Sequence, residues 1–154
     1  MGKIDVVHKC LDFMLKCLKN SNARIDIYGD GENLEFLRSN LNHFNYKGIS
    51  TDVAQDLKSY DIYISTSDLE GVCTTTIEGL LMHKKVLIRN CPCNEIFSNF
   101  SNVFLFDDEN DFPISLEKAK EAPLIPRDEK LDQFRWENCN SNLLKILSNK
   151  SEIN

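Results

Sequence analysis

The chain has 154 residues, of which 42% are hydrophobic and 27% charged, and its formal net charge is -6. This length predicts one domain with its own core, and the acidic balance argues against a nucleic-acid footprint over the whole surface. No apolar run approaches the roughly 18 residues of a membrane span, and the N-terminus reads neither as a secretory signal nor as a transit peptide, so we expect the chain as given in a soluble compartment.

The spacing of the six cysteines favours free, mostly buried thiols in a reducing compartment. Cys10 and Cys17 share one face of a predicted helix, and a single residue separates Cys91 from Cys93. A zinc site would need a second close pair of ligands, and none is visible. The acidic run 107–109 is most simply a solvated loop, so no metal is expected.

Apolar residues at helical spacing predict an opening helix over about residues 5–19, with no strand before it. Further along, short β-branched and aromatic runs alternate with helical patterns. The predicted strands cover 24–28, 44–47, 61–65, 85–89 and 102–106, and the later predicted helices cover 34–41, 53–58, 74–83, 95–100, 112–120 and 128–147. This alternation predicts an α/β fold, a Rossmann-like parallel sheet with helices on both faces.

Prolines divide the predicted domain from its C-terminal extension. Pro123 and Pro126 mark a linker. We therefore expect a Rossmann-like domain over residues 1–122, a linker and a C-terminal helix that packs back on it over 123–148, and a frayed tail over 149–154.

A pair of glycines closes the strand over residues 24–28. Gly29 and Gly31 permit positive φ or a close backbone approach where the strand turns into the next helix. The dinucleotide fingerprint is incomplete, because Leu34 stands where its third glycine belongs and the next strand ends in Gly48 rather than in an acidic residue. We favour a tight turn that approaches a phosphate or a base over an NAD site.

The stretch 61–89 reads as strand, loop, helix and strand, which is a βαβ crossover. Ligands of open parallel sheets bind outside the carboxyl ends of the strands, so the loop that carries Glu70 and the helix start at Thr74 face a candidate site. The amides of that helix start suit a phosphate, and the carboxylates of Glu70 and Glu78 suit vicinal hydroxyls of a sugar. The alternative is that these residues bind no ligand: the threonines cap the helix and pack within it, and the two glutamates are exposed charges. The chemistry alone leaves both open.

Several motifs carry a family resemblance. Glu70 to Glu78 resembles the E-x7-E motif of retaining family-4 glycosyltransferases, enzymes of two Rossmann-like halves (the glycosyltransferase-B architecture), and residues 27–31 resemble the strand and glycine loop that precede it. Within that family, residues 72–78, 92–97 and 134–137 look like digalactosyldiacylglycerol synthases, which make plastid galactolipids. The resemblance covers nearly the whole chain, but only the nucleotide-binding C-terminal half of such an enzyme.

The resemblance implies a donor-binding set, with Glu70 as the catalytic residue. Glu78 would hold the ribose hydroxyls, and Glu70 would hold the donor sugar together with the backbone of Gly71 and Val72. The segment 73–75 would follow the diphosphate, 48–50 would contact the base, and Lys3 would lie near the diphosphate. The full set is Lys3, Gly29, Gly31, Gly48, Ile49, Ser50, Glu70, Gly71, Val72, Cys73, Thr74, Thr75 and Glu78.

The resemblance also implies a reaction: galactose passes from UDP-galactose to a galactolipid with retention, without a metal or other cofactor. The partners implied are the nucleotide sugar and an acceptor-binding half, on another chain or missing from this one, through which peripheral membrane contact would come; no nucleic acid is expected. The location implied is cytosolic or at the plastid envelope. The alternative is a non-catalytic or split-enzyme subunit that binds a nucleotide sugar or a partner chain.

This chain departs from the family pattern at several positions. His83 replaces the glycine that is usual after the central helix, Cys91 and Cys93 replace a histidine and a serine, and Glu70 replaces an aspartate. These changes bear on the choice of donor sugar.

Overall fold

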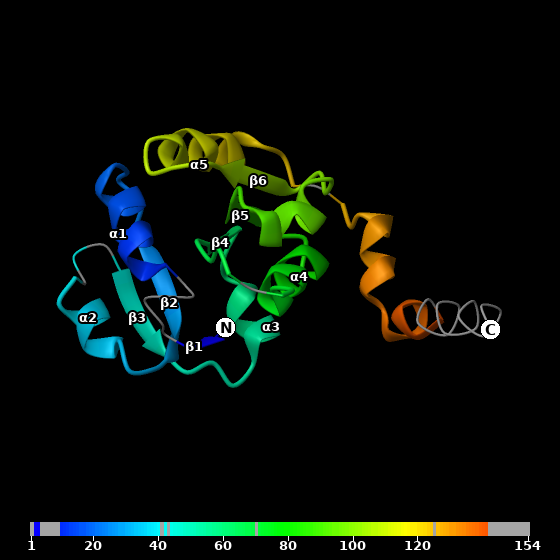
Figure 1. Ribbon diagram of the computed structural model, residues 1–154, viewed down its shortest axis with the longest axis horizontal. Coiled ribbons are helices and arrows are strands. Elements are labelled where there is room, and N and C mark those ends of the chain that lie inside the picture. The colour runs from blue at the N-terminus through cyan, green and yellow to red at the C-terminus, as the bar shows by residue number, and fades with distance from the viewer. Residues whose placement is uncertain are drawn as a thin grey trace, which may run out of the picture.

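The computed structural model describes residues 2–3, 10–40, 42, 44–69, 71–124 and 126–141. Its strands are β1 (Gly2–Lys3), β2 (Ile25–Asp30), β3 (Phe44–Gly48), β4 (Ile62–Ser65), β5 (Lys85–Arg89) and β6 (Val103–Phe106) (Figure 1). Its α-helices are α1 (Leu11–Lys19), α2 (Leu34–Arg38), α3 (Val53–Leu57), α4 (Thr74–Leu81) and α5 (Asp111–Glu121), and two 3-10 helices are η2 (Pro92–Phe97) and η3 (Glu129–Phe134).

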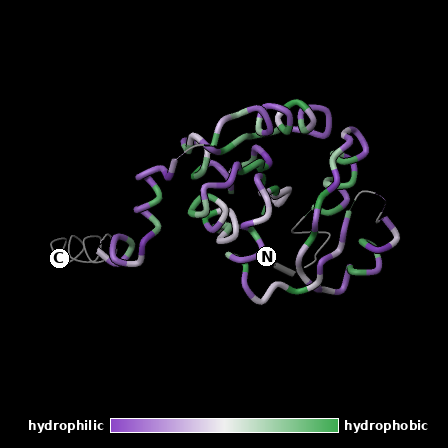
Figure 2. Tube along the Cα trace, turned by 180° about the vertical axis from the view of Figure 1, so that it is seen from behind, coloured by the Kyte–Doolittle hydropathy of each residue, from purple (hydrophilic) through white to green (hydrophobic). Residues whose placement is uncertain are grey.

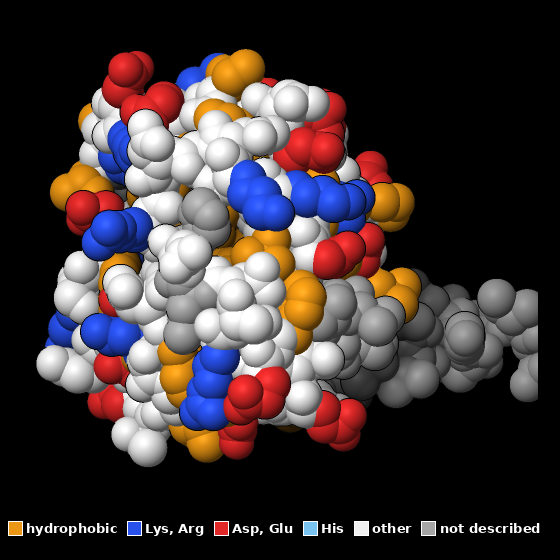
Figure 3. Space-filling model, turned by 90° about the vertical axis from the view of Figure 1, so that its left-hand side faces the viewer, with side chains coloured by type: hydrophobic (Ala, Val, Ile, Leu, Met, Phe, Trp, Pro, Cys, Tyr) orange, Lys and Arg blue, Asp and Glu red, His pale blue; other side chains and the backbone are white. Residues whose placement is uncertain are grey.

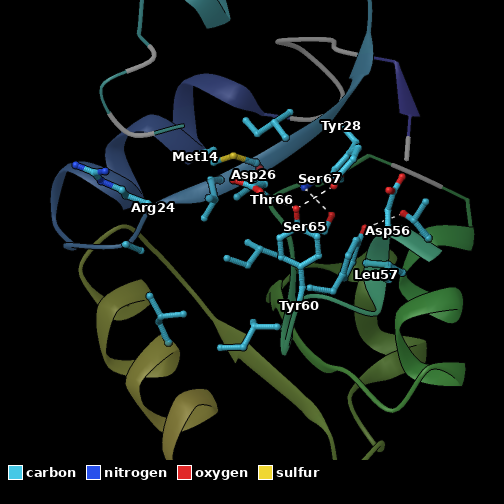
Figure 4. A pocket seen from close by; sticks show the side chains of 18 of the residues that line it. Met14, Arg24, Asp26, Tyr28, Asp56, Leu57, Tyr60, Ser65, Thr66 and Ser67 are labelled. Atoms are coloured by element: carbon cyan, nitrogen blue, oxygen red, sulfur yellow. Dashed lines mark hydrogen bonds between the residues drawn. The ribbon is translucent and has the colours of Figure 1, made fainter. Parts of the chain in front are cut away.

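The described strands form two sheets of three, in the orders β1-β2-β3 and β4-β5-β6. Every pairing is parallel; in the second sheet, for example, Val86 pairs with both Tyr63 and Val103. The predicted α/β class with parallel strands is confirmed. The strands divide into two sheets, because no ladder among the described residues joins β1 to β4. A cavity of 530 Å³, lined by side chains of both β2 and β4, lies between them (Figure 4).

Helices cover both faces of the second sheet because β5 is apolar on both sides. Leu87 packs into a core with α1, α5 and the first sheet. Its neighbours Val86 and Ile88 point the other way, into a core with α4, η2 and η3. All three side chains are fully buried. A strand that is buried on both faces is typical of the centre of a parallel sheet, and it places α4 and α5 on opposite sides.

A strand precedes α1, so the expectation that none does is wrong. Gly2 pairs with Gly29 and Lys3 with Asp30 of β2. Two residues are too few to show a strand period in the sequence, and the pairing comes from the neighbouring strand. The described part of α1 begins at Leu11, and the predicted start of this helix, over residues 5–9, lies outside the described residues.

Two predicted helices near the C-terminus differ from those observed. The segment expected as a helix over 95–100 is the 3-10 helix η2, which Pro92 begins. Asn94, inside η2, donates from Nδ2 to the carbonyl of Arg89 at 2.8 Å. The helix expected over 128–147 is broken at the extended Arg135: η3 precedes it, residues 136–141 are helical, and the remainder lies outside the described residues.

The segment after α5 contacts the domain through η3. Leu131 is buried, and Phe134 has its ring centroid 6.0 Å from that of Phe97 and 6.1 Å from that of Phe100. This contact lies against the core on one face of the second sheet, and η3 is drawn in orange in Figure 1.

The surface carries mixed charges. Lys and Arg side chains alternate with Asp and Glu over the face seen in Figure 3. Hydrophilic and hydrophobic residues also alternate along α5, as a helix with one covered face requires (Figure 2). Within the described residues, no helix has both the length and the apolar character that crossing a membrane needs.

Candidate ligand-binding site

A run of buried polar residues ends β4. Ser65, Thr66 and Ser67 are 7%, 1% and 3% exposed, although they lie where the strand opens into the loop toward α4. All three line the cavity between the sheets, together with Tyr28 of β2 (Figure 4). Burial of hydroxyls at the carboxyl end of a parallel strand fits a polar binding edge.

The start of α4 is held by Tyr63 of β4. Its hydroxyl lies 2.7 Å from Thr75 Oγ1 and 3.8 Å from Cys73 Sγ, and these two atoms are 3.2 Å apart. Burial raises the pKa of the Tyr63 phenol. The hydroxyl of Thr75 and the thiol of Cys73 are thus engaged inside the protein. What α4 offers a ligand is its first backbone amides, which receive no side-chain cap from Cys73.

Two residues of the predicted set have buried polar atoms without a hydrogen-bond partner among the described residues. They are Glu78, through Oε2, and Ser50, through Oγ; Thr76 Oγ1 is in the same state. Leaving such an atom unpaired costs about 1–3 kcal/mol, and more when it is charged. A ligand hydroxyl would satisfy the Glu78 carboxylate, so this helix position is suited to binding a sugar ring.

The first sheet brings the glycine positions together at its carboxyl edge. Lys3 pairs with Asp30, and Gly48 with Tyr28, so the ends of β1, β2 and β3 are adjacent. Gly48 has φ +82, which a side chain would strain. Gly31 donates its amide to Asp30 Oδ1 at 2.8 Å. The backbone here turns tightly at the edge where ligands of parallel sheets bind.

The predicted set is not gathered into one cavity. Of its described members, Thr75 alone lines the cavity between the sheets. Gly71, Val72, Thr74 and Ile49 are exposed. Glu70, the predicted catalytic residue, lies outside the described residues.

The sequence interpretation missed an ion pair that ties the loop after β4 to β5. Asp68 Oδ2 lies 2.8 Å from Arg89 Nη1, and the Arg89 guanidinium lies 4.3 Å from the centre of the Phe13 ring. The available signal was an arginine at the carboxyl end of a strand with an apolar centre. The pair fixes the first half of the loop whose second half carries Glu70.

The acidic run 107–109 makes ordinary turn contacts. Asp107 accepts from Asn90 Nδ2 at 2.7 Å, and Asp108 Oδ1 accepts from the amides of Asn110 and Asp111 at 2.7 and 2.9 Å. Across the described part of the chain, no three His, Cys, Asp or Glu side chains are grouped so that they could hold a metal ion.

Parallel strands, glycines of positive φ near the ends of β2 and β3 and an uncapped helix after β4 define a Rossmann-like α/β domain. In open parallel sheets of this kind, ligands bind at the carboxyl ends of the strands. Residues 1–120 match the family model described as group 1 glycosyl transferases. The chain belongs to this family, which is glycosyltransferase family 4.

The curated relatives include digalactosyldiacylglycerol synthases. The chloroplastic synthase 2 of Glycine max is 28% identical over 131 residues, and the chloroplastic synthase 1 of Arabidopsis thaliana is 31% identical over 141 residues. Each match covers 81% of this chain, but only 28% and 17% of the respective relative. The resemblance to this group within the family is confirmed, for part of the relatives' length.

Solved structures show the same fold at low sequence identity. Anabaena HepE in complex with UDP and glucose superposes with a TM-score of 0.77 at 16% identity, covering 96% of this chain and 47% of that one. The catalytic domain of cholesterol-α-glucosyltransferase from Helicobacter pylori gives a TM-score of 0.62 at 13% identity, with 92% and 96% covered. The architecture is that of one half of a glycosyltransferase-B enzyme.

Proposed function

We propose that this chain is the donor-binding half of a retaining glycosyltransferase, that its donor is UDP-galactose and that the acceptor is a galactolipid. The observation that carries the proposal is the buried, unpartnered Oε2 of Glu78, one turn inside the helix that follows β4, in a family-4 domain. The names of the relatives support a galactolipid product, and UDP in complexes of structural neighbours supports a nucleotide-sugar donor.

Each part of the site has a role in this proposal. Glu78 Oε2 accepts a hydrogen bond from a ribose hydroxyl. The backbone amides at 74–75 donate hydrogen bonds to the diphosphate, which lies at the positive end of the α4 dipole. The turn at 48–50 contacts the base, where Ser50 Oγ is available. The loop segment 70–72 holds the galactose, and the glycine turn of β2 with Lys3 closes the diphosphate side.

The reaction follows from charge placement. The bond between the galactosyl carbon and the diphosphate oxygen breaks, and a bond to the acceptor oxygen forms on the same face of the sugar. The acceptor hydroxyl gives its proton to the leaving diphosphate. Negative charge grows on the leaving diphosphate, where the α4 amides are aimed, so they stabilise the transition state without a metal. Glu70 acts beside the reacting carbon.

Calorimetric titration with UDP and UDP-galactose tests the proposal. We expect binding to the parent chain, and a loss of about tenfold to a hundredfold in affinity for Glu78→Gln, since hydrogen bonds to a charged group contribute about 1.5–3 kcal/mol. The matched control is Glu121→Gln, an exposed glutamate of α5, which should bind like the parent. Absence of binding at millimolar ligand, or equal affinities for Glu78→Gln and the control, would contradict the proposal.

A second candidate function is a split-enzyme or non-catalytic subunit. In this candidate, the chain binds a nucleotide sugar or a partner chain but does not catalyse the transfer by itself. The acceptor pocket and any membrane contact then come from a second half. Incubation of the chain with UDP-galactose and a galactolipid distinguishes the two candidate functions. Formation of the galactosylated lipid by the chain alone excludes this second candidate, and its formation only after a Rossmann-like partner is added supports it.

A further inference from the structure

Two cysteines meet at the carboxyl end of β5. Cys91 precedes η2 and Cys93 lies in its first turn, with Pro92 between them. Their Sγ atoms are 3.2 Å apart, and both side chains are partly exposed. Cys91 also lines a second cavity, of 480 Å³, that opens beside η2. A small reagent can therefore reach the pair.

We propose that Cys91 and Cys93 form a redox-active dithiol that a low-molecular-weight disulfide, such as oxidised glutathione, converts to an intramolecular disulfide. One cysteine thiolate attacks the glutathione disulfide, forms a mixed disulfide and releases one glutathione thiolate. The second cysteine then attacks the protein sulfur of that mixed disulfide and releases the second glutathione. The two cysteines lose two electrons and two protons, and two reduced glutathione molecules carry them away.

The geometry favours closure of this ring. A disulfide bond is about 2.05 Å long, so the sulfur atoms need to approach by only about 1 Å from their 3.2 Å contact. Pro92 has a fixed φ, so fewer backbone conformations compete with the one in which the two sulfur atoms are in contact. A ring this small is strained, and strained disulfides are readily reduced again, as a reversible site requires.

The other cysteines lack these features. Cys10, Cys17 and Cys73 are buried. Cys139 is exposed, with its thiol directed to the carbonyl of Gln133 at 3.3 Å.

Formation of the disulfide removes one hydrogen bond between Cys91 and the loop after β4. The Cys91 thiol donates to the carbonyl of Ser67 at 3.7 Å, and Asn94 Nδ2 donates to Cys91 Sγ at 3.4 Å. Burial, followed by the contact with Cys93, raises the pKa of Cys91 to about 11, so the reduced thiol keeps the proton that it donates. The disulfide has no such proton. The pair is therefore a modification site that loosens the loop at Ser67 when it is oxidised.

The test uses the full chain with Cys139→Ser, which removes the exposed thiol, treated with oxidised glutathione. We expect the mass to fall by two hydrogen atoms, the disulfide to map to the peptide that holds Cys91 and Cys93, and dithiothreitol to reverse both. Amide hydrogen exchange of residues 65–69 should become about two- to tenfold faster on oxidation, the factor that one lost hydrogen bond corresponds to. Neither measurement uses a nucleotide, so the result is independent of the proposed donor.

Single variants provide the control. With Cys93→Ser or Cys91→Ser in the same background, the reaction should stop at a stable adduct of one glutathione. Parent protein that stays reduced, or that accumulates the same adduct as the variants, overturns the dithiol. An internal disulfide without faster exchange at 65–69 overturns the link to the loop.

Discussion

The two sheets are joined by a charge-assisted hydrogen bond whose removal should have a pH-dependent effect. Tyr60, just before β4, donates to Asp26 Oδ2 of β2 at 2.6 Å. The same carboxylate accepts from Asn45 Nδ2 at 2.8 Å and lies 3.5 Å from Lys47 Nζ. The Tyr60 hydroxyl, followed by Asn45 and Lys47, lowers the pKa of Asp26 below its ordinary value of 3.8.

Tyr60→Phe should therefore lower the free energy of unfolding by about 2 kcal/mol at pH 7, since a hydrogen bond to a charged group contributes about 1.5–3 kcal/mol. Because the folded pKa of Asp26 is depressed, its contribution is complete above pH 3.8 and is lost as the pH falls through the folded value. The difference between parent and variant should shrink over that window to about 1 kcal/mol, the value of a neutral hydrogen bond.

Urea unfolding followed by circular dichroism at pH 7 and at a pH low enough to protonate Asp26 in the folded protein measures this difference. The control is Tyr46→Phe, which removes a hydroxyl that donates to the neutral carbonyl of Gly29 at 3.0 Å. Tyr46→Phe should lower the free energy of unfolding by about 1 kcal/mol at both pH values. The reasoning fails if Tyr60→Phe stays within 0.5 kcal/mol of the parent at pH 7, where roughly 2 is expected, or if its cost does not change with pH.

Two further predictions concern α4 and its exit. His83 has φ 58, a left-handed conformation that costs a non-glycine residue about 1–2 kcal/mol. His83→Gly should therefore raise the melting temperature by about 2–4 °C, even though glycine gives the unfolded chain more conformational entropy. An unchanged or lower melting temperature would show that the turn is not strained. A Cβ added at Gly79 would lie 3.4 Å from Tyr63 Cβ and 3.5 Å from Val86 Cγ2. In urea unfolding, Gly79→Ala should keep or raise stability, whereas Gly79→Val should lower it by about 1–3 kcal/mol; similar effects of both would mean that α4 packs less closely.

The site was partly predictable from sequence. The loop after β4 and the glycine turns lie at the ends of patterned elements, where ligands of parallel sheets bind, and Glu78 lies one turn inside the helix that follows that loop. Glu78 and Ser50 each have an unpartnered buried oxygen, while the ligand roles of the set stay predictions. The Asp68–Arg89 pair and the Tyr60–Asp26 bond were not predictable, because 21 and 34 residues separate their partners.

What the sequence determined by itself is local and periodic. The run 85–89, with its apolar centre, is a strand with the predicted bounds, and the helix predicted over 112–120 is Asp111–Glu121. Asp52, directly before α3, accepts from the amide of Gln55 at 3.0 Å as a helix cap does. These features depend on residues within a few positions of one another, so the order of side chains is enough to specify them. The alternation of such elements then implied a parallel α/β fold.

Only the tertiary structure decided the rest. It paired Gly2 and Lys3 as a strand, divided the strands between two sheets, and brought the thiol of Cys91 to the carbonyl of Ser67. Each of these depends on which distant segment packs alongside, and a backbone group takes the partner that packing supplies. Local periodicity carries no record of that choice.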